Sequence, residues 1–253
     1  MNLHEILHTL VFGFPVTAEL IDHSYPVWLQ STGGLVLTLI ITGISLVCGL
    51  MIGLLLAAVR STETRGKEII SLRPMWIAGM LIKYVSIAFT EVLRGLPIMI
   101  IVLLVYYLPF ALFRLRAPGV LLAIFAFSMY AGVYLSDIFQ SGFRAVGQSR
   151  LGVARVMGLS KLQILTHIKI PIAFHTMIPA ILGIAVTVLK DSSVLMVVAV
   201  PELTFTSRQI QISDPRLYAA TLLMVLMLYW LIALAGSIGV HYLERRWERR
   251  AAV

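Results

Sequence analysis

Long runs of residues without a charged side chain constrain this sequence more than any other feature. Residues 33–59 contain no Asp, Glu, Lys or Arg, and about 20 apolar residues are enough for a helix to cross the hydrocarbon core of a bilayer. Only 13% of the 253 residues are charged and 59% are hydrophobic, whereas soluble domains carry about 25% charged residues. The solvent of this chain is therefore largely lipid. That conclusion excludes an ordinary soluble enzyme, a disordered chain and a coiled coil.

Four further runs share this character, and together they predict an all-α integral membrane protein with five transmembrane helices. They cover residues 96–113, 117–136, 172–189 and 217–243. The segment 75–93 is different because Lys83 interrupts it. We expect that segment to form an interfacial helix that leads into the second span.

The positions of the basic residues predict the orientation of the spans. Fourteen of the 20 basic residues lie in residues 60–83, 140–171 and 245–250, and the first 59 residues contain none. Because cytoplasmic segments are enriched in Lys and Arg, we expect the N-terminus outside and the C-terminus in the cytoplasm. In a cell inner membrane, the chain then divides into a periplasmic or interfacial segment (1–30), a transmembrane domain (31–243) and a basic cytoplasmic tail (244–253).

The segment between the third and fourth spans, residues 140–171, is too long for a simple connection. Loops beyond about 15 residues are usually functional or disordered, but this one mixes apolar with basic residues and contains no acid. Val153, Val156 and Met157 follow helical spacing, and Gly158 marks a break or a C-cap. The pattern predicts two short amphipathic helices joined by a tight turn. Such helices either lie on the bilayer or dock into a groove of a partner.

Residues 141–160, SGFRAVGQSRLGVARVMGLS, resemble the EAA loop of ATP-binding-cassette (ABC) importer permeases, and most of all that of the polar-amino-acid branch. The residues on family positions in this segment are Ser141, Gly142, Ala145, Val146, Ala154, Gly158, Leu159 and Ser160. Further motifs follow in the family's order, and they comprise Gly34 with Thr38 and Leu39, Arg94 and Gly95 with Pro97, Pro171, Pro179, residues 190–194, and Glu202 with Leu203. The sequence departs from the family at Gly152, which occupies the position of the family's glutamate.

The resemblance implies a type I ABC importer permease fold (MetI-like), in which cytoplasmic coupling helices carry the motion of ATPase subunits to the spans. The ATPase contact that it implies consists of Arg150, Gly152, Val153, Ala154, Arg155, Val156, Met157, Gly158, Leu159 and Lys161. The apolar members can transmit force by packing, and the basic members can meet an acidic rim. Glycine at position 152 removes one charged contact.

The resemblance also implies a set of partners. These are two ABC ATPase subunits, a second permease subunit in a homo- or heterodimer, and a periplasmic or lipid-anchored substrate-binding protein; no nucleic acid is expected. The chain itself is not expected to be an enzyme, because Gly66 and Lys67 are followed by Glu68 and no G-x-x-x-x-G-K-[ST] run occurs. ATP and Mg²⁺ would be held by the partner ATPase, and this chain would bind no cofactor directly. A polar amino acid or a related small solute would cross by alternating access.

Ionisable residues near membrane depth are costly and are therefore candidates for a role in transport. The candidates for the substrate pathway are Glu91, Arg94, Lys190, Asp191, Ser192 and Glu202. An amino acid carries an ammonium and a carboxylate group, which residues of opposite charge can bind. The alternative is structural, because Glu91 with Arg94 and Lys190 with Asp191 can each form an ion pair near an interface or gate.

Two other classes of membrane protein compete with this interpretation. The first class is a membrane zinc metalloprotease. Its motif H-E-x-x-H is matched by residues 4–8, which include His4, Glu5 and His8. The match lies at a fray-prone terminus, with Val11 where a metzincin has glycine, so no metal site is predicted. The other class is a stand-alone secondary transporter. It predicts paired repeats, which five spans cannot supply.

Small residues recur every four positions in the first predicted span, at Ser45, Gly49 and Gly53. Such a stripe lets a second helix approach closely, so it predicts a packing surface and allows dimerisation. The single cysteine, Cys48, excludes a disulfide scaffold and any multi-cysteine metal site.

Overall fold

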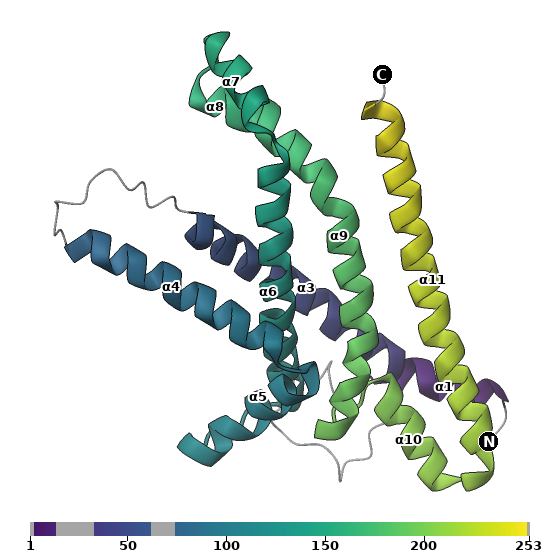
Figure 1. The fold of residues 1–253 in the computed structure, drawn as a ribbon. Coiled ribbons are helices and arrows are strands. Elements are labelled where there is room, and N and C mark those ends of the chain that lie inside the picture. Colours follow the sequence, from purple (N-terminus) through teal and green to yellow (C-terminus); the bar gives the residue numbers. More distant parts are fainter. Residues whose placement is uncertain (1–2, 14–32, 62–73, 252–253) are drawn as a thin grey trace.

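The computed structural model describes residues 3–13, 33–61 and 74–251, and Figure 1 shows long helices that cross or diverge, with shorter helices near their ends. The boundary expected at residues 30 and 31 lies outside the described residues. The α-helices are α1 (Leu3–Phe12), α3 (Gly34–Ser61), α4 (Pro74–Gly95), α5 (Ile98–Phe113), α6 (Gly119–Ala145), α7 (Gln148–Val156), α8 (Lys161–Ile164), α9 (Ile170–Asp191), α10 (Leu203–Ser213) and α11 (Tyr218–Ala251). A π-helical segment, η2 (Leu165–Lys169), and two 3₁₀ segments, η3 (Ser192–Val198) and η4 (Pro215–Leu217), complete the described elements.

Four helical segments are long and apolar enough to cross a membrane by themselves. They are Gly34–Arg60, Gly119–Ala145, Ile170–Val198 and Pro215–Leu243, which confirms the first, third, fourth and fifth predicted spans. The second predicted span is α5, whose 16 residues fall short of a full crossing. Together with Ala78–Gly95 of α4 it forms a broken span that bends by 111°. The described residues therefore contain four helical segments that can cross a membrane, or five if the bent pair counts as one.

The bend between α4 and α5 follows from two residues that end one helix and start the next. Gly95 is the last residue of α4, and Pro97 precedes α5 with a φ of −57° and a ψ of 139°. Proline disfavours helical geometry in the residue before it but suits the start of a helix. The expected interfacial helix over residues 75–93 is thus a separate helix, set at a steep angle to α5.

Among the described helices, α3 and α6 share the most extensive contact, and the stripe of small residues lies in this interface. A Cβ atom on Gly49 would lie 2.9 Å from the Cβ of Ala131, and one on Gly53 would lie 2.8 Å from the Cβ of Leu135. Ser45 donates to the backbone oxygen of Ile124 at 3.2 Å. Rising numbers on α3 meet rising numbers on α6, so the two helices run in parallel. The predicted packing surface is confirmed, and it is used within the chain.

A second, smaller core lies at the end of the bundle where α1, α10 and the start of α11 meet (Figure 1). It contains Ile6 and Leu10 from α1, Leu203 and Ile210 from α10, and Val225 from α11. The amphipathic α1 therefore packs on the bundle through one face. This core fixes the chain segment between η3 and α10.

The expectation of two separate short helices in residues 140–171 is half correct. The first helix is α7, but the second is not separate, because α8 continues through η2 into α9. Pro171 lies in the first turn of α9 and has no N–H to donate to the preceding turn. The wider π turns just before it let the backbone pass this point without ending the helix. The basic tail is likewise a continuation of α11, which is helical to Ala251.

Candidate functional site

The turn after α7 is held by a hydrogen-bond pattern that its sequence explains. Gly158 has a left-handed φ of +79°, which suits glycine. The N–H of Leu159 donates to the carbonyl of Ala154, and the N–H of Gly158 donates to the carbonyl of Arg155. These are the two bonds of a Schellman C-cap, so the predicted break at Gly158 is confirmed.

The chain then restarts through a capping box between Ser160 and Gln163. The N–H of Ser160 donates to Gln163 Oε1 at 2.9 Å, and the N–H of Gln163 donates to Ser160 Oγ at 3.3 Å. Each side chain satisfies a backbone donor of the other residue. The turn between α7 and α8 is therefore locally specified, and it holds α7 at the tip formed by the ends of α6 and α9 (Figure 1).

Helix α7 has one buried and one exposed apolar face. Leu151 and Ala154 are buried, whereas the side chains of Val153, Val156 and Met157 are 61%, 90% and 74% exposed. Large exposed apolar groups that gather at one place mark an interaction site. The arrangement can receive a partner by packing.

The remaining predicted members of this surface differ in what the structure describes. Arg155 is exposed, and Leu159 is half-buried. A Cβ atom on Gly152 would meet nothing within 4 Å, so there is space for a side chain at this position. The side chains of Arg150 and Lys161 lie outside what the structure describes.

Of the predicted pathway residues, Asp191 has the most specific environment. Its Oδ2 accepts a hydrogen bond from the hydroxyl of Tyr130 at 3.1 Å, so an acid on α9 is joined to α6. Tyr130 packs in turn against Tyr134, with ring centroids 4.9 Å apart. Lys190 is exposed beside this pair, and Ser192 is buried with its hydroxyl on the carbonyl of Leu189. Tyr130 is missing from the sequence prediction, because its partner lies 61 residues away.

Glu202 serves a different purpose, because it is fully buried as the N-cap of α10. Its carboxylate accepts from the N–H of Thr204 at 2.9 Å, from the N–H of Phe205 at 2.8 Å and from the hydroxyl of Tyr229 at 3.2 Å. Burial raises the pKa of Glu202 to about 7, while these donors act in the opposite direction. The residue ties α10 to α11.

The predicted pair of Glu91 and Arg94 is present, with 3.8 Å between Glu91 Oε1 and Arg94 Nη1. The stronger partner of Arg94 is Asp137 on α6, which the sequence prediction missed. Asp137 also accepts from Arg60 Nη1 of α3 at 2.9 Å. The position of Asp137 in the sequence could have marked it as a candidate, because this acid directly follows the uncharged run of the third predicted span.

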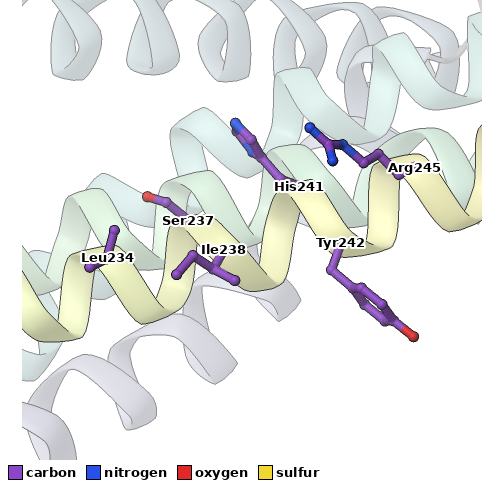
Figure 2. A pocket seen from close by; sticks show the side chains of 6 residues that line it. All are labelled: Leu234, Ser237, Ile238, His241, Tyr242 and Arg245. Atoms are coloured by element: carbon purple, nitrogen blue, oxygen red, sulfur yellow. The ribbon is translucent and has the colours of Figure 1, made fainter.

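An open groove of about 430 Å³ runs along residues 234–245 of α11 (Figure 2). The residues that line it are Leu234, Ser237, Ile238, His241, Tyr242 and Arg245. All of them lie on one helix, and in Figure 2 Ser237, His241 and Arg245 point to the same side, away from Tyr242. The groove contains none of the predicted site residues.

The H-E-x-x-H match lies on α1, where His4, Glu5 and His8 are exposed. Among the described residues, no three His, Cys, Asp or Glu side chains gather to hold a metal ion. The further acids and histidine near this match, Glu19, Asp22 and His23, lie outside the described residues.

Comparison with curated proteins finds amino-acid permeases. The chain is 23% identical to the L-cystine transport system permease protein TcyB of Bacillus subtilis, over 97% of both chains. It is 28% identical to the glutamate/aspartate import permease protein GltK of Escherichia coli, over 84% of this chain and 91% of the other. It is 27% identical to the glutamine transport system permease protein GlnP of E. coli, over 84% and 90%.

Comparison with solved structures finds the same fold. A crystal structure of an amino acid ABC transporter with histidines matches with a TM-score of 0.73 at 24% identity, over 84% of this chain and 92% of the other. A chain of the inward-facing MetNI methionine ABC transporter matches with a TM-score of 0.60 at 20% identity, over 82% and 93%. The predicted MetI-like fold is therefore confirmed. Neither the zinc protease nor the secondary transporter finds support in these comparisons.

A family model matches residues 75–249, which include all of α4 except its first residue, α5 to α10 and most of α11. Its description is the binding-protein-dependent transport system inner membrane component. The match covers more than half of the chain, and the motifs of residues 141–160, the helix order and the related folds agree with it. The chain therefore belongs to the family of binding-protein-dependent transport system inner membrane components, and it is a permease subunit of an ABC importer.

Proposed function

We propose that this permease moves a polar amino acid or a related small solute inward by alternating access. The substrate class rests on the relatives, whose names specify cystine, glutamate, aspartate or glutamine. Each of these solutes carries an ammonium and a carboxylate group. Two ATPase subunits drive the cycle, and the pathway lies between this subunit and a second permease subunit in a homo- or heterodimer. The ATPases hold ATP and Mg²⁺.

The observation that carries the coupling part of the proposal is the exposed face of α7. Val156 is 90% exposed at the tip of the molecule, although it is an apolar residue on a helix that a Schellman C-cap ends. A short amphipathic helix binds a groove through such a face. Arg155, together with Arg150 and Lys161, supplies positive charge that an acidic rim of the groove would attract. Val153, Val156 and Met157 form the apolar centre of this contact, beside Gly152, Ala154, Gly158 and Leu159.

The substrate pathway is proposed to pass the Tyr130–Asp191 pair. The half-buried carboxylate of Asp191 lies next to the exposed Lys190 in an apolar span. A carboxylate and an ammonium in adjacent positions complement the two charged groups of an amino acid. Among the other candidates, Ser192 adjoins this pair, whereas Glu91, Arg94 and Glu202 have partners within the protein that favour structural roles.

The proposed orientation places α7 and the C-terminus in the cytoplasm and the N-terminus outside. Its support is the distribution of the basic residues, which gather in residues 140–171 and 245–250. A periplasmic or lipid-anchored binding protein would then deliver the solute to the end of the bundle that contains α1 and α10. The ATPases would approach the opposite end.

Co-purification tests the coupling part of the proposal. The tagged chain is expressed with the ATPase and the permease encoded beside its gene, and the ATPase is expected to remain bound through purification. If the ATPase is never retained, the proposed coupling is wrong.

Uptake of a panel of labelled amino acids into proteoliposomes, with the binding protein present, tests the substrate class. Absence of uptake for every amino acid would contradict that part alone.

A further inference from the structure

Asp137 joins three helices through its two carboxylate oxygens. Oδ1 accepts from Arg60 Nη1 at 2.9 Å, at the end of α3, and Oδ2 accepts from Arg94 Nη2, at the end of α4. Asp137 itself lies on α6. We call Asp137 with Arg60 and Arg94 the Asp137 junction.

The charges of the junction are balanced by its neighbours. Two arginines face one aspartate, and Glu91 supplies the second negative charge 3.8 Å from Arg94. Arg60 is only 13% exposed, and it also donates to Ser136 Oγ at 3.0 Å. With its side-chain amide oxygen turned toward Arg60, Gln140 accepts from the same guanidinium at 3.2 and 3.3 Å. Hydrogen bonds between ionised partners are short and strong, so the junction fixes the helices that it joins.

The junction lies on the helix that leads to α7. Helix α6 is continuous from Asp137 to Ala145, and α7 begins three residues later at Gln148. At about 1.5 Å per residue, Asp137 lies roughly 12 Å from the end of α6. Asp137 therefore lies on the helix that adjoins α7, separated from it by Val146 and Gly147. On the other side of the junction, Arg94 is the last residue before Gly95 and the 111° bend between α4 and α5.

Arg60 and Arg94 differ in how much other packing already holds their helices against α6. Helix α3 is already held against α6 by the close approach of Gly49 and Gly53. Helix α4 packs less closely: a Cβ atom on Gly79 or Gly95 would meet nothing within 4 Å, although Ser86 and Thr90 are buried. Its apolar side chains are mostly exposed, and they include Leu81, Ile82, Val85 and Val92. Arg94 thus adds a charged link between α4 and α6 to a small packing contact, whereas Arg60 adds to an extensive interface.

We propose that Asp137 is a positioning residue for transport, which makes the α4–α5 bend follow α6 when the ATPases move α7. This inference rests on the proposed coupling of α7 to an ATPase. It assigns the transmission step to the Arg94–Asp137 pair. Loss of Arg94 uncouples ATP hydrolysis from transport, and loss of Arg60 has a smaller effect.

A distance measurement tests the inference without knowledge of the solute. Spin labels are placed at position 79 on α4 and position 144 on α6 of a Cys48→Ala chain, in the complete complex with its ATPase. In the wild-type background, the distance between the labels keeps a single narrow distribution before and after vanadate trapping with ATP. In Arg94→Gln, the distribution broadens or shifts after trapping. Arg116→Gln, which removes one positive charge from the exposed turn between α5 and α6, is the control and behaves as wild type.

A functional measurement adds a readout that a purely structural role would not move. In proteoliposomes with the binding protein and ¹⁴C-labelled amino acids, Arg94→Gln and Asp137→Asn raise the ATP hydrolysed per solute at least about tenfold, the factor that corresponds to 1.4 kcal/mol. Arg60→Gln raises it less. Asp137→Glu, which keeps the charge, restores part of the coupling. Retention of the ATPase on the purified chain stays unchanged in all four variants.

The outcomes separate this inference from the proposed function. If the wild-type chain does not retain its ATPase, the proposed coupling is wrong, irrespective of the results for the variants. If the ATPase is retained but Arg94→Gln matches Arg116→Gln in both the label distances and the ATP ratio, the inference about Asp137 is wrong. Failure of Arg94→Gln to assemble with the ATPase overturns it as well, because the pair would then serve folding rather than transmission.

Discussion

Tyr130 donates its hydroxyl hydrogen to Asp191 over 3.1 Å, which connects the middle of α6 with the end of α9. The bond orients a half-buried carboxylate beside Lys190 and Ser192. An oriented carboxylate can receive an ammonium group, whereas a freely rotating one loses part of that interaction to conformational entropy. The pair therefore leads directly to a test of the proposed pathway.

Replacing Tyr130 by Phe removes the donor and keeps the ring. A hydrogen bond to a charged group contributes about 1.5–3 kcal/mol, so we expect the KM for amino-acid uptake to rise about tenfold or more. Uptake kinetics in proteoliposomes measure this change. The matched control is Tyr107→Phe on the exposed face of α5, which should leave the KM as it is. Equal KM values for Tyr130→Phe and wild type would contradict a role of the pair in binding.

Replacing Val156 by Glu tests the exposed face of α7. The side chain is 90% exposed, so the fold is expected to tolerate the change. A carboxylate in the apolar centre of an interface has no partner, and such central positions contribute about 2 kcal/mol or more to binding. The dissociation constant for the ATPase should therefore rise roughly thirtyfold, as measured by retention on the purified chain.

Two further variants complete that test. Ile212→Glu changes an equally apolar residue, 65% exposed on α10 at the other end of the bundle, and should retain the ATPase. Combined charge reversal of Arg155 and Lys161 should abolish uptake while membrane insertion stays intact. Normal retention in Val156→Glu together with normal uptake in the charge-reversed chain would exclude α7 as the docking surface.

Local sequence signals predicted the individual helices well, but not the contacts between distant motifs. Gly158 correctly indicates the end of α7, because few other residues adopt its left-handed backbone geometry. By contrast, Arg94 has an obvious partner three residues away in Glu91, and its stronger partner Asp137 is 43 residues away. No periodicity within a helix reports such a pairing. The sequence shows that Arg94 is a costly charge near the membrane, and only the fold shows which acid offsets it.

The first and the last motif of the family resemblance also make a contact that the sequence does not predict. The sequence places Gly34 and Thr38 on the first span, and Glu202 and Leu203 after the fourth. In the fold they meet, because the N–H of Leu203 donates to Thr38 Oγ1 at 3.1 Å and Gly34 pairs with Glu202 in a parallel bridge. This contact explains why Glu202 is buried. From sequence alone it was a pathway candidate, because a glutamate beside a span is equally suited to either role.

The α3–α6 interface gives a prediction about stability. A Cβ atom at position 53 would lie 2.8 Å from the Cβ of Leu135 and 3.0 Å from the carbonyl oxygen of Gly132. Gly53→Ala should therefore destabilise the chain by about 1–3 kcal/mol, the range for overpacking. Gly43 lies on the same helix with nothing within 4 Å of a Cβ atom, so Gly43→Ala should be neutral or stabilising by at most about 1 kcal/mol. Thermal unfolding in detergent measures both, and equal shifts would mean that the packing is not as described.

The buried carboxyl group of Glu202 leads to a prediction of how the free energy of unfolding depends on pH. Burial raises the pKa of Glu202 to about 7 in the folded protein, above the 4.5 of a free glutamate. The folded state therefore binds a proton that the unfolded state has already lost between pH 4.5 and pH 7. In that window stability falls as pH rises, because the slope follows the difference in bound protons. Below the lower value both states are protonated, and the contribution is fully present.

The size of this effect and its origin can be measured with one variant. At 1.36 kcal/mol per pKa unit, the loss between the two pH limits is of the order of 3 kcal/mol. Glu202→Gln keeps the shape of the side chain but cannot titrate, so its melting temperature should depend less on pH between 4.5 and 7 than that of the wild type. Its backbone partners Thr204 and Phe205 should remain protected from hydrogen exchange, because the amide oxygen still accepts at the start of α10. Identical pH profiles for the two proteins would show that Glu202 is ionised throughout, held by its three donors rather than neutralised by burial.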